Sequence, residues 1–175
     1  MRVGVIGYSG EIESNKILKL KDISYELGRE IAARGHSLIS GGRDGIMYYV
    51  SKGCIEKGGL SVGVLPYETA DEGNEFLTFP LTTGLSMDMR SNIMINSSDA
   101  VIMLGGEIGT LYELILAYIH KKIIAIINST GGWADRIQSV LYDGKYLDTR
   151  KLTEIRSFDN TLNALDYIED KFATF

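Results

Sequence analysis

The residues best suited to chemistry lie in one stretch, where an apolar run leads through glycines into a helical pattern. Ala100–Leu104 is apolar and of strand length, and apolar residues recur at helical spacing from Leu111 onward. The residues with chemical potential in between and just beyond are Gly105, Gly106, Glu107, Gly109, Thr110 and Glu113. A glycine turn that opens a helix presents unpaired backbone N–H groups at the positive end of the helix dipole. The stretch therefore predicts a phosphate or carboxylate site, in which the Thr110 hydroxyl caps the helix or binds the anion.

Three charged side chains accompany this loop. Glu113 lies one turn into the predicted helix, where the dipole favours an acid and where a carboxylate can orient a sugar hydroxyl or a water. Glu107 lies inside the loop and repels a phosphate unless its side chain points away. Arg90 opens another predicted helix. Arginine binds phosphate and carboxylate in a bidentate manner, although a lone surface arginine needs no function.

Other glycine loops also follow predicted strands. The candidate ligand-binding positions in them are Gly7, Ser9, Gly41, Gly42 and Gly45. Paired glycines let a backbone approach a ligand closely, whereas the neighbouring Arg43 and Asp44 are either functional or solvated loop charges. The first loop lacks the GxGxxG spacing of a dinucleotide fingerprint, and no lysine follows Gly109 as in a Walker loop. Neither of those two motifs is therefore inferred.

Strand-like and helical patterns alternate along the whole chain. The spacing of apolar residues predicts one helix over 16–34 and another over 133–142, while 66–86 is expected to be a long loop around a short apolar piece. The alternation predicts an α/β fold, three-layered and Rossmann-like, with a mainly parallel sheet. Residues 1–175 are expected to form a single domain.

The fold predicts where the glycine loops meet. In a parallel sheet the carboxyl ends of the strands lie at one edge, and ligands bind beyond that edge. The loops at 7–10, 41–45, 105–109 and 129–132 all follow predicted strands. We therefore expect them to gather around one shared site.

The composition limits the partners. The net charge is −5 and no basic run is present, so nucleic acid is not expected as a partner. The single cysteine, Cys54, allows no internal disulfide framework and indicates no metal cluster. No apolar run reaches the ~18 residues of a membrane span, and a strand pattern stands where a signal peptide would lie. The cytoplasm is the expected location.

Several motifs occur in an order that is typical of one superfamily. They are VGVIGYSG, LISGGRDGIM, MDMRSNIMINSSDAVIMLGGEIGTLYE and the region through TGGWADRI, and they cover most of the chain. With these motifs the chain resembles the Rossmann-like superfamily of the Lonely guy cytokinin-activating phosphoribohydrolases, once misnamed lysine decarboxylases, and the molybdenum-cofactor carrier proteins. The prokaryotic carrier-like branch is the closer match. The resemblance implies a homo-oligomer (dimer or tetramer) and a phosphorylated small-molecule ligand, such as a nucleotide or the molybdenum cofactor, with no other cofactor required.

The resemblance also assigns roles to residues. The phosphoribohydrolase signature is PGGxGTxxE, with an upstream arginine usually followed by lysine. The matching residues here are Gly106, Gly109, Thr110, Glu113 and Arg90. In that family the glutamate and the arginine are the catalytic pair that acts on a nucleoside 5′-monophosphate. The departures are Gly105 for the proline, Glu107 for the second glycine and Ser91 for the lysine, and they weigh against hydrolysis more than against binding.

Three functions remain open at this point. The first is a binding or carrier protein, with the phosphate at Gly109 and Thr110 and its charge neutralised by Arg90. The second is an N-glycosidase of nucleoside 5′-monophosphates, in which Glu113 stabilises the developing oxocarbenium charge and Arg90 orients the phosphoribose. The third is an oligomeric interaction protein with a vestigial site, whose interface is formed by the helices that follow residues 87 and 109.

Overall fold

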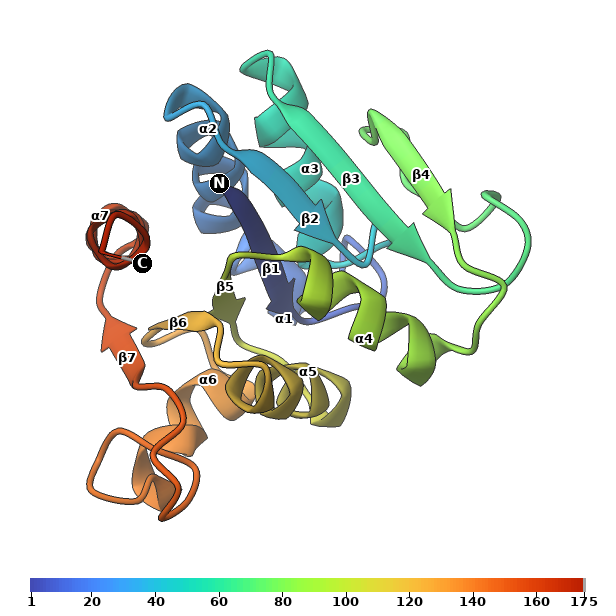
Figure 1. The fold of residues 1–175 in the computed structure, drawn as a ribbon. Coiled ribbons are helices and arrows are strands. Elements are labelled where there is room, and N and C mark those ends of the chain that lie inside the picture. Colours follow the sequence, from blue (N-terminus) through green and yellow to red (C-terminus); the bar gives the residue numbers. More distant parts are fainter. Residues whose placement is uncertain (175) are drawn as a thin grey trace.

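The computed structural model describes residues 1–174 and contains one seven-stranded sheet between two layers of helices (Figure 1). The strand order is β4-β3-β2-β1-β5-β6-β7, and all neighbours pair in parallel. The strands are β1 (Arg2–Gly7), β2 (Ser37–Ser40), β3 (Leu60–Leu65), β4 (Phe79–Thr82), β5 (Ala100–Leu104), β6 (Ile123–Ile127) and β7 (Ile155–Phe158). The helices are α1 (Asn15–Leu18), α2 (Lys21–Ala33), α3 (Ile46–Glu56), α4 (Met87–Ser97), α5 (Ile108–Ile119), α6 (Gly132–Arg136) and α7 (Thr161–Phe172). The predicted α/β architecture is confirmed.

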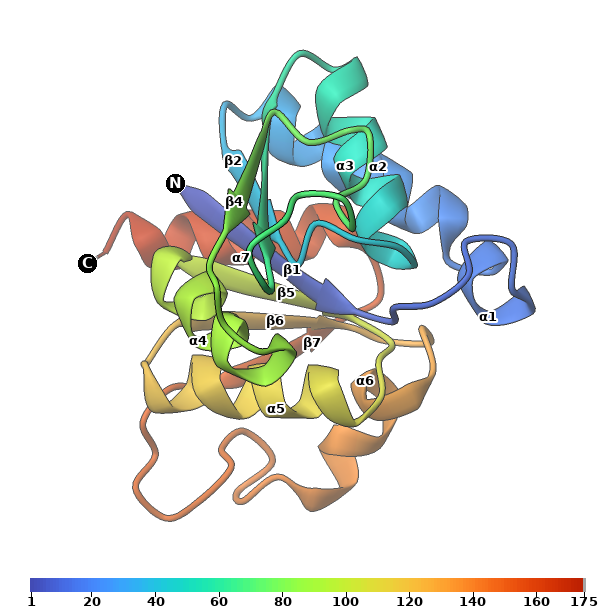
Figure 2. The same ribbon diagram turned by 90° about the vertical axis from the view of Figure 1, so that its right-hand side faces the viewer.

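The central strands are buried on both faces because helices cover the sheet on each side (Figure 2). β5 and β6 are buried along their whole length, which is typical of parallel strands with continuous apolar sequences. Ile102 packs toward the layer of α2, α3 and α7, whereas its neighbour Met103 packs toward the layer of α4, α5 and α6. No helix within residues 1–174 is long and apolar enough to cross a membrane.

Two predicted helices are shorter than expected. The helix over 16–34 is divided into α1 and α2, because Leu20 leaves helical geometry with φ −104° and ψ 0°. The helix over 133–142 is α6 followed by a 3₁₀ turn, Ile137–Val140, after which Leu141 is extended. Apolar spacing continues across both breaks, so periodicity alone does not reveal them.

Residues 66–86 form the expected long loop, with the edge strand β4 inside it. Pro80 fits in β4 because one side of an edge strand needs no ladder partner. Asn74 fastens the first half of the loop to the turn after β2. Its backbone N–H and its Nδ2 donate to the Gly42 carbonyl at 2.8 and 3.1 Å, and Nδ2 also donates to the Arg43 carbonyl at 2.8 Å. The loop therefore lies beside the carboxyl end of β2.

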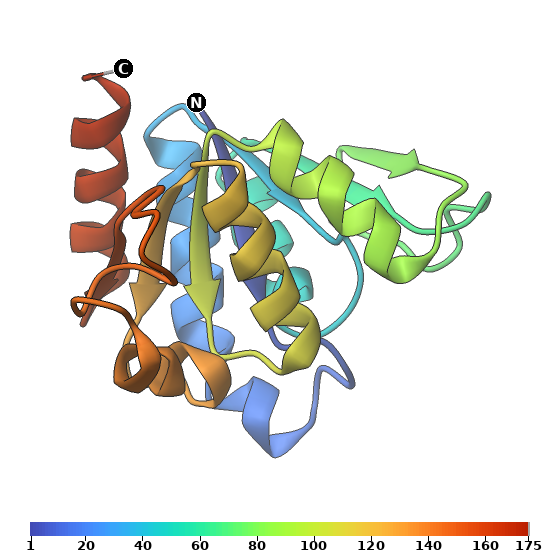
Figure 3. The same cartoon turned by 60° about the horizontal axis from the view of Figure 1, so that its bottom comes forward.

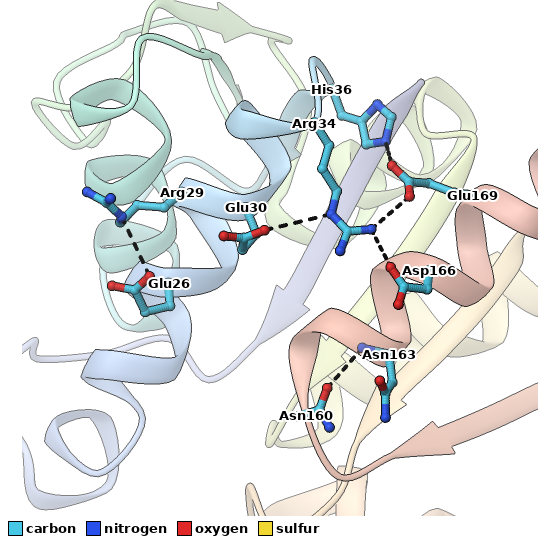
Figure 4. A network of polar contacts seen from close by, with 9 residues as sticks. All are labelled: Glu26, Arg29, Glu30, Arg34, His36, Asn160, Asn163, Asp166 and Glu169. Carbon is cyan, nitrogen blue, oxygen red and sulfur yellow. Dashed lines mark hydrogen bonds and ion pairs between the residues drawn. The ribbon is translucent and has the colours of Figure 1, made fainter.

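The last helix, α7, is joined to α2 by a cluster of ion pairs (Figure 4). Nη1 of Arg34 lies 2.6 Å from Asp166 and 2.7 Å from Glu169. Nε2 of His36 lies 2.6 Å from the other oxygen of Glu169. The Asn160 side chain caps the N-terminus of α7. These contacts belong to the framework, on the opposite side of the sheet from α4 and α5.

Candidate functional site

A cavity of about 490 Å³ lies at the carboxyl ends of β1 and β2, between the first halves of α4 and α5. Figure 3 shows the arrowheads of β5 and β6 on the side of the molecule where α5 and α6 begin. The predicted site residues that line the cavity are Gly7, Ser9, Gly41, Arg90, Gly109, Thr110 and Glu113. Three of the four glycine loops therefore meet there. The fourth, 129–132, does not reach the cavity wall.

The start of α5 supplies the predicted anion loop. The Leu111 N–H donates to the Glu107 carbonyl at 3.0 Å and closes the first helical turn. The N–H groups of Ile108, Gly109 and Thr110 have no carbonyl four residues earlier within the helix. A Cβ on Gly109 would meet no atom within 4 Å, so the space beside this turn is open.

Thr110 ties this turn to β1. Its hydroxyl donates to the Gly7 carbonyl at 2.9 Å. The hydroxyl has one proton, and that proton is directed away from the cavity. The hydroxyl bonds to Gly7 in this structure, and its roles as helix cap and as anion donor stay predictions. The backbone N–H of Thr110 is the group that remains for an anion.

Two pairs of glycines, one before α5 and one at the start of α6, pack against each other behind the anion loop. The four positions, all with positive φ, are Gly105, Gly106, Gly131 and Gly132. The Trp133 N–H donates to the Gly106 carbonyl at 2.9 Å, and Trp133 itself packs against the core. A Cβ on Gly106 would overlap the Thr110 side chain. Gly106 is not among the residues that line the cavity and helps to hold the loop, and its contact with a ligand stays a prediction.

Gly42 and Gly45 also lie behind the cavity wall. Their φ values are +70° and +65°. A Cβ on Gly42 would overlap Gly63 in β3, and a Cβ on Gly45 would overlap the backbone at Tyr8. Their role as ligand contacts stays a prediction. They allow the loop after β2 to pack against β3 and against the loop after β1.

Arg90 is a buried cation at the cavity wall. Its side chain is 6% exposed, and its Nε has no hydrogen-bond partner within the described residues. Nη1 lies 3.4 Å from the Met94 sulfur, and Nη2 lies 3.5 Å from the Met87 sulfur. Thioether sulfur is a weak acceptor, so these contacts do not replace an anion. Burial lowers the pKa of Arg90, although the nearby Glu113 carboxylate opposes this effect.

Glu113 lies beside Arg90, with 3.8 Å between Oε1 and Nη1. The same oxygen accepts a hydrogen bond from the Ser91 hydroxyl at 3.0 Å. Burial raises the pKa of Glu113, and Arg90 and Ser91 oppose that shift. The predicted pairing of Arg90 with Glu113 is present, and Ser91 adds a neutral donor to it.

Glu107 lies at the rim of the cavity and pairs with a cation. Its Oε1 lies 2.8 Å from Nζ of Lys16, and its side chain is 70% exposed. Lys16 also lies over the Tyr8 ring, 5.0 Å from its centroid. The carboxylate inside the anion loop is therefore neutralised by α1 and directed toward solvent.

Sequence reasoning left Arg43 undecided and did not identify Lys16 or the methionines. Arg43 lines the cavity, as do Met47, Met87 and Met94. Arg43 directly follows Gly42 in a loop at the carboxyl edge of the sheet. A glycine loop after a strand is the same pattern that predicted the other parts of the site. The methionines carry no comparable signal, because their spacing matches an ordinary core helix.

Comparison with solved structures supports the fold assignment. A structural genomics target is 44% identical, covers 97% of this chain and 98% of its own, and has a TM-score of 0.91. The molybdenum cofactor binding protein of Rippkaea orientalis is 28% identical, with 98% and 96% covered and a TM-score of 0.81. The molybdenum cofactor carrier protein of Chlamydomonas reinhardtii is 26% identical, with 98% of each chain covered and a TM-score of 0.78.

Comparison of sequences gives the family. A cytokinin riboside 5′-monophosphate phosphoribohydrolase of Mycobacterium tuberculosis is 32% identical over 162 residues, which is 84% of each chain. The SLOG cluster4 family matches residues 1–162. The predicted resemblance to the superfamily of phosphoribohydrolases and molybdenum-cofactor carriers is confirmed, and the chain belongs to the SLOG cluster4 family.

Proposed function

We propose that the chain is a binding or carrier protein for a phosphorylated small molecule, either a nucleotide or a cofactor of the molybdopterin kind. The observation that carries the proposal is Arg90, a buried guanidinium at the cavity wall. Its Nε has no hydrogen-bond partner among residues 1–174, its other nitrogens contact thioethers, and the nearest carboxylate, Glu113, is 3.8 Å away. A buried cation without a hydrogen-bonded anion is costly, and a ligand anion removes that cost.

The cavity suits such a ligand in size and in polarity. Its volume of about 490 Å³ is in the range of small-molecule sites. The N–H groups at the start of α5 would receive the phosphate, and Arg90 would neutralise it. The apolar wall contributed by Met47, Met87 and Tyr112 would contact the rest of the molecule. The carrier and binding proteins among the structural relatives support this function, with the molybdenum cofactor as cargo.

A second candidate is hydrolysis of nucleoside 5′-monophosphates. The observation that favours it is the pair formed by Arg90 and Glu113 at the cavity, together with the phosphoribohydrolase relative. Glu113 as a carboxylate would stabilise positive charge on the ribose during cleavage of the N-glycosidic bond. The departures from the phosphoribohydrolase signature at Gly105, Glu107 and Ser91 weigh against hydrolysis and make binding the better supported function.

The first experiment identifies the ligand. Freshly purified protein is denatured, and the released small molecules are analysed by mass spectrometry. A phosphorylated compound present in amounts comparable to the protein is the expected result. Isothermal titration with nucleoside monophosphates then compares wild type with Arg90→Ala and with the exposed control Arg150→Ala. We expect Arg90→Ala alone to weaken binding by about tenfold or more.

Each alternative has its own outcome in the same set of assays. Release of free base from a nucleoside monophosphate, abolished in Glu113→Ala, would establish the hydrolase instead. The absence of released ligand, together with no binding at millimolar concentration, would favour a vestigial site. Equal affinities of wild type and Arg90→Ala would contradict the role given to Arg90.

We also propose that the chain forms a homodimer through α4 and α5. The exposed apolar residues on this face are Met89, Ile108, Tyr112, Ile115 and Ile119. Those on α5 recur every three or four residues. The one charged residue of α5, Glu113, is not exposed. The stripe continues into the cavity wall at Ile108 and Tyr112, so a second copy on it would cover the cavity.

Light scattering after size-exclusion chromatography tests the dimer. We expect Ile115→Asp to give a monomer, because it places a charge in the middle of the stripe. Leu162→Asp, which changes an exposed apolar residue on α7, is the matched control and should leave the mass unchanged. A monomeric wild type would overturn the assignment of this face.

A further inference from the structure

We infer that the cavity contains a second anion subsite formed by Arg43 and Arg90, so that its ligand is a phosphate ester carrying a second, separate anionic group. The inference rests on the proposed binding function and specifies the class of ligand. It is carried by the arrangement of the two arginines around one methionine.

Arg43 and Arg90 converge on the sulfur of Met87. Nη1 of Arg43 lies 3.4 Å from this atom, and Nη2 of Arg90 lies 3.5 Å from it. Both arginines line the cavity, and Met87 lies between them in the first turn of α4. Two guanidinium groups on either side of a neutral thioether repel each other. The repulsion is relieved when an anion binds between them.

The carboxylates near these arginines leave part of each guanidinium available. Glu72 in the loop 66–86 contacts Arg43 through Nε, at 3.0 Å, and Glu113 approaches Arg90 only to 3.8 Å. Asp88, also on the cavity wall, accepts a hydrogen bond from Ser86 at 2.6 Å. The terminal nitrogens of Arg43 can thus donate to a ligand, since Nη1 contacts only the weak acceptor sulfur of Met87.

Arg90 lies between the start of α5 and Arg43, because its Nη1 is 3.8 Å from Glu113 of α5 while its guanidinium also packs against Gly41. Gly41 and Arg43 both follow β2. The anion loop follows β5, and β1 lies between those strands. Neighbouring strands are about 4.8 Å apart, so the end of β2, which Arg43 follows, and the end of β5 are separated by roughly 10 Å. One phosphate group does not span that distance, whereas a ligand with two anionic groups does.

Arg43 can be changed without releasing the loop that covers it. Asn74 holds the loop through the carbonyls of Gly42 and Arg43, and both contacts are to the backbone. Arg43→Ala therefore removes the guanidinium and keeps the loop anchored. Glu72→Gln removes the competing carboxylate and frees Arg43 for the ligand.

The test compares adenosine 5′-monophosphate with adenosine 3′,5′-bisphosphate by isothermal titration. We expect wild type to bind the bisphosphate at least about tenfold more tightly. Arg43→Ala should lose that preference and keep its affinity for the monophosphate within about twofold, while Glu72→Gln should increase the preference. Arg29→Ala, an exposed arginine on α2, is the control and should behave as wild type.

The outcomes separate this inference from the proposed function. Binding of the monophosphate without a preference for the bisphosphate, or an equal loss of both affinities in Arg43→Ala, overturns the second subsite alone. Failure of wild type to bind either compound overturns both proposals for nucleotides. Crystals soaked in inorganic phosphate give an independent readout: two phosphate ions are expected in wild type, and only the one at α5 in Arg43→Ala.

Discussion

The Ser91 hydroxyl donates a 3.0 Å hydrogen bond to Oε1 of Glu113 and so joins α4 to α5 beside the cavity. In the phosphoribohydrolase pattern a lysine is usual at the position of Ser91. A neutral hydroxyl stabilises the charged carboxylate less than an ammonium group does. Burial therefore raises the pKa of Glu113 despite the presence of Arg90.

Replacement of Glu113 should change how stability depends on pH. Because the pKa is raised in the folded state, the stabilising contribution of this carboxyl is complete below its unfolded pKa and is lost as pH rises through the folded value. We expect Glu113→Gln to exceed wild type in free energy of unfolding at about pH 8 and to show no advantage near pH 4. Urea unfolding at several pH values measures this. An advantage of wild type that grows with pH would contradict it.

Arg90→Met should separate stability from binding. The methionine side chain fits among the sulfurs of Met87 and Met94 and removes a buried charge. Replacement of buried charges by apolar residues is often neutral or stabilises by about 1–4 kcal/mol. We expect an unchanged or higher melting temperature of the free protein and a loss of ligand affinity of about tenfold or more. A large drop in melting temperature would show that Arg90 is mainly structural.

Gly106 and Gly109 form a matched pair within one loop. Gly106 has φ +102°, and a Cβ there would overlap Thr110, whereas a Cβ on Gly109 would meet open space. Gly106→Ala should reduce the free energy of unfolding by about 1–3 kcal/mol. Gly109→Ala should preserve stability, because alanine favours helix, and should weaken phosphate binding. Thermal melts and titrations of both variants check this, and equal melting temperatures would contradict the assignment.

The ion pair between Lys16 and Glu107 should tune affinity at the rim of the cavity. Glu107→Gln removes a negative charge from the anion loop, and Lys16→Ala exposes that charge. We expect the first variant to bind a phosphorylated ligand about two- to fivefold more tightly and the second to bind it more weakly by a similar factor, since exposed pairs contribute about 0.2–1 kcal/mol. Titrations at low and high salt measure both. Effects that persist unchanged in high salt would argue against an electrostatic origin.

Much of the fold follows from local sequence patterns. The continuous apolar runs of β5 and β6 predict strands buried on both faces, and the glycines after β1, β2 and β5 predict turns at one edge. The break at Leu20 was not predictable, because apolar spacing continues across it.

The site was predictable in its location but not in all its members. Glycines that line a cavity and glycines that let loops pack look the same in sequence. Sequence alone therefore does not distinguish Gly109, which lines the cavity, from Gly42, Gly45 and Gly106, which pack behind it. Lys16 reaches Glu107 from a helix far away in the chain, and no short-range pattern records that contact. The contact between Arg43 and Met87 forms only when α4 packs beside the loop after β2, so the sequence does not reveal it.

The hydrogen bond from Thr110 to the Gly7 carbonyl should affect the rate at which a ligand binds. Together with the two packed pairs of glycines, it orders the start of α5 before any ligand arrives, so conformational entropy at this end is lost during folding and not during binding. On the other side of the cavity, Arg43 must instead exchange its ion pair with Glu72 for one with the ligand. Association should therefore occur in two kinetic phases, a fast capture at α5 followed by a slower rearrangement at Arg43.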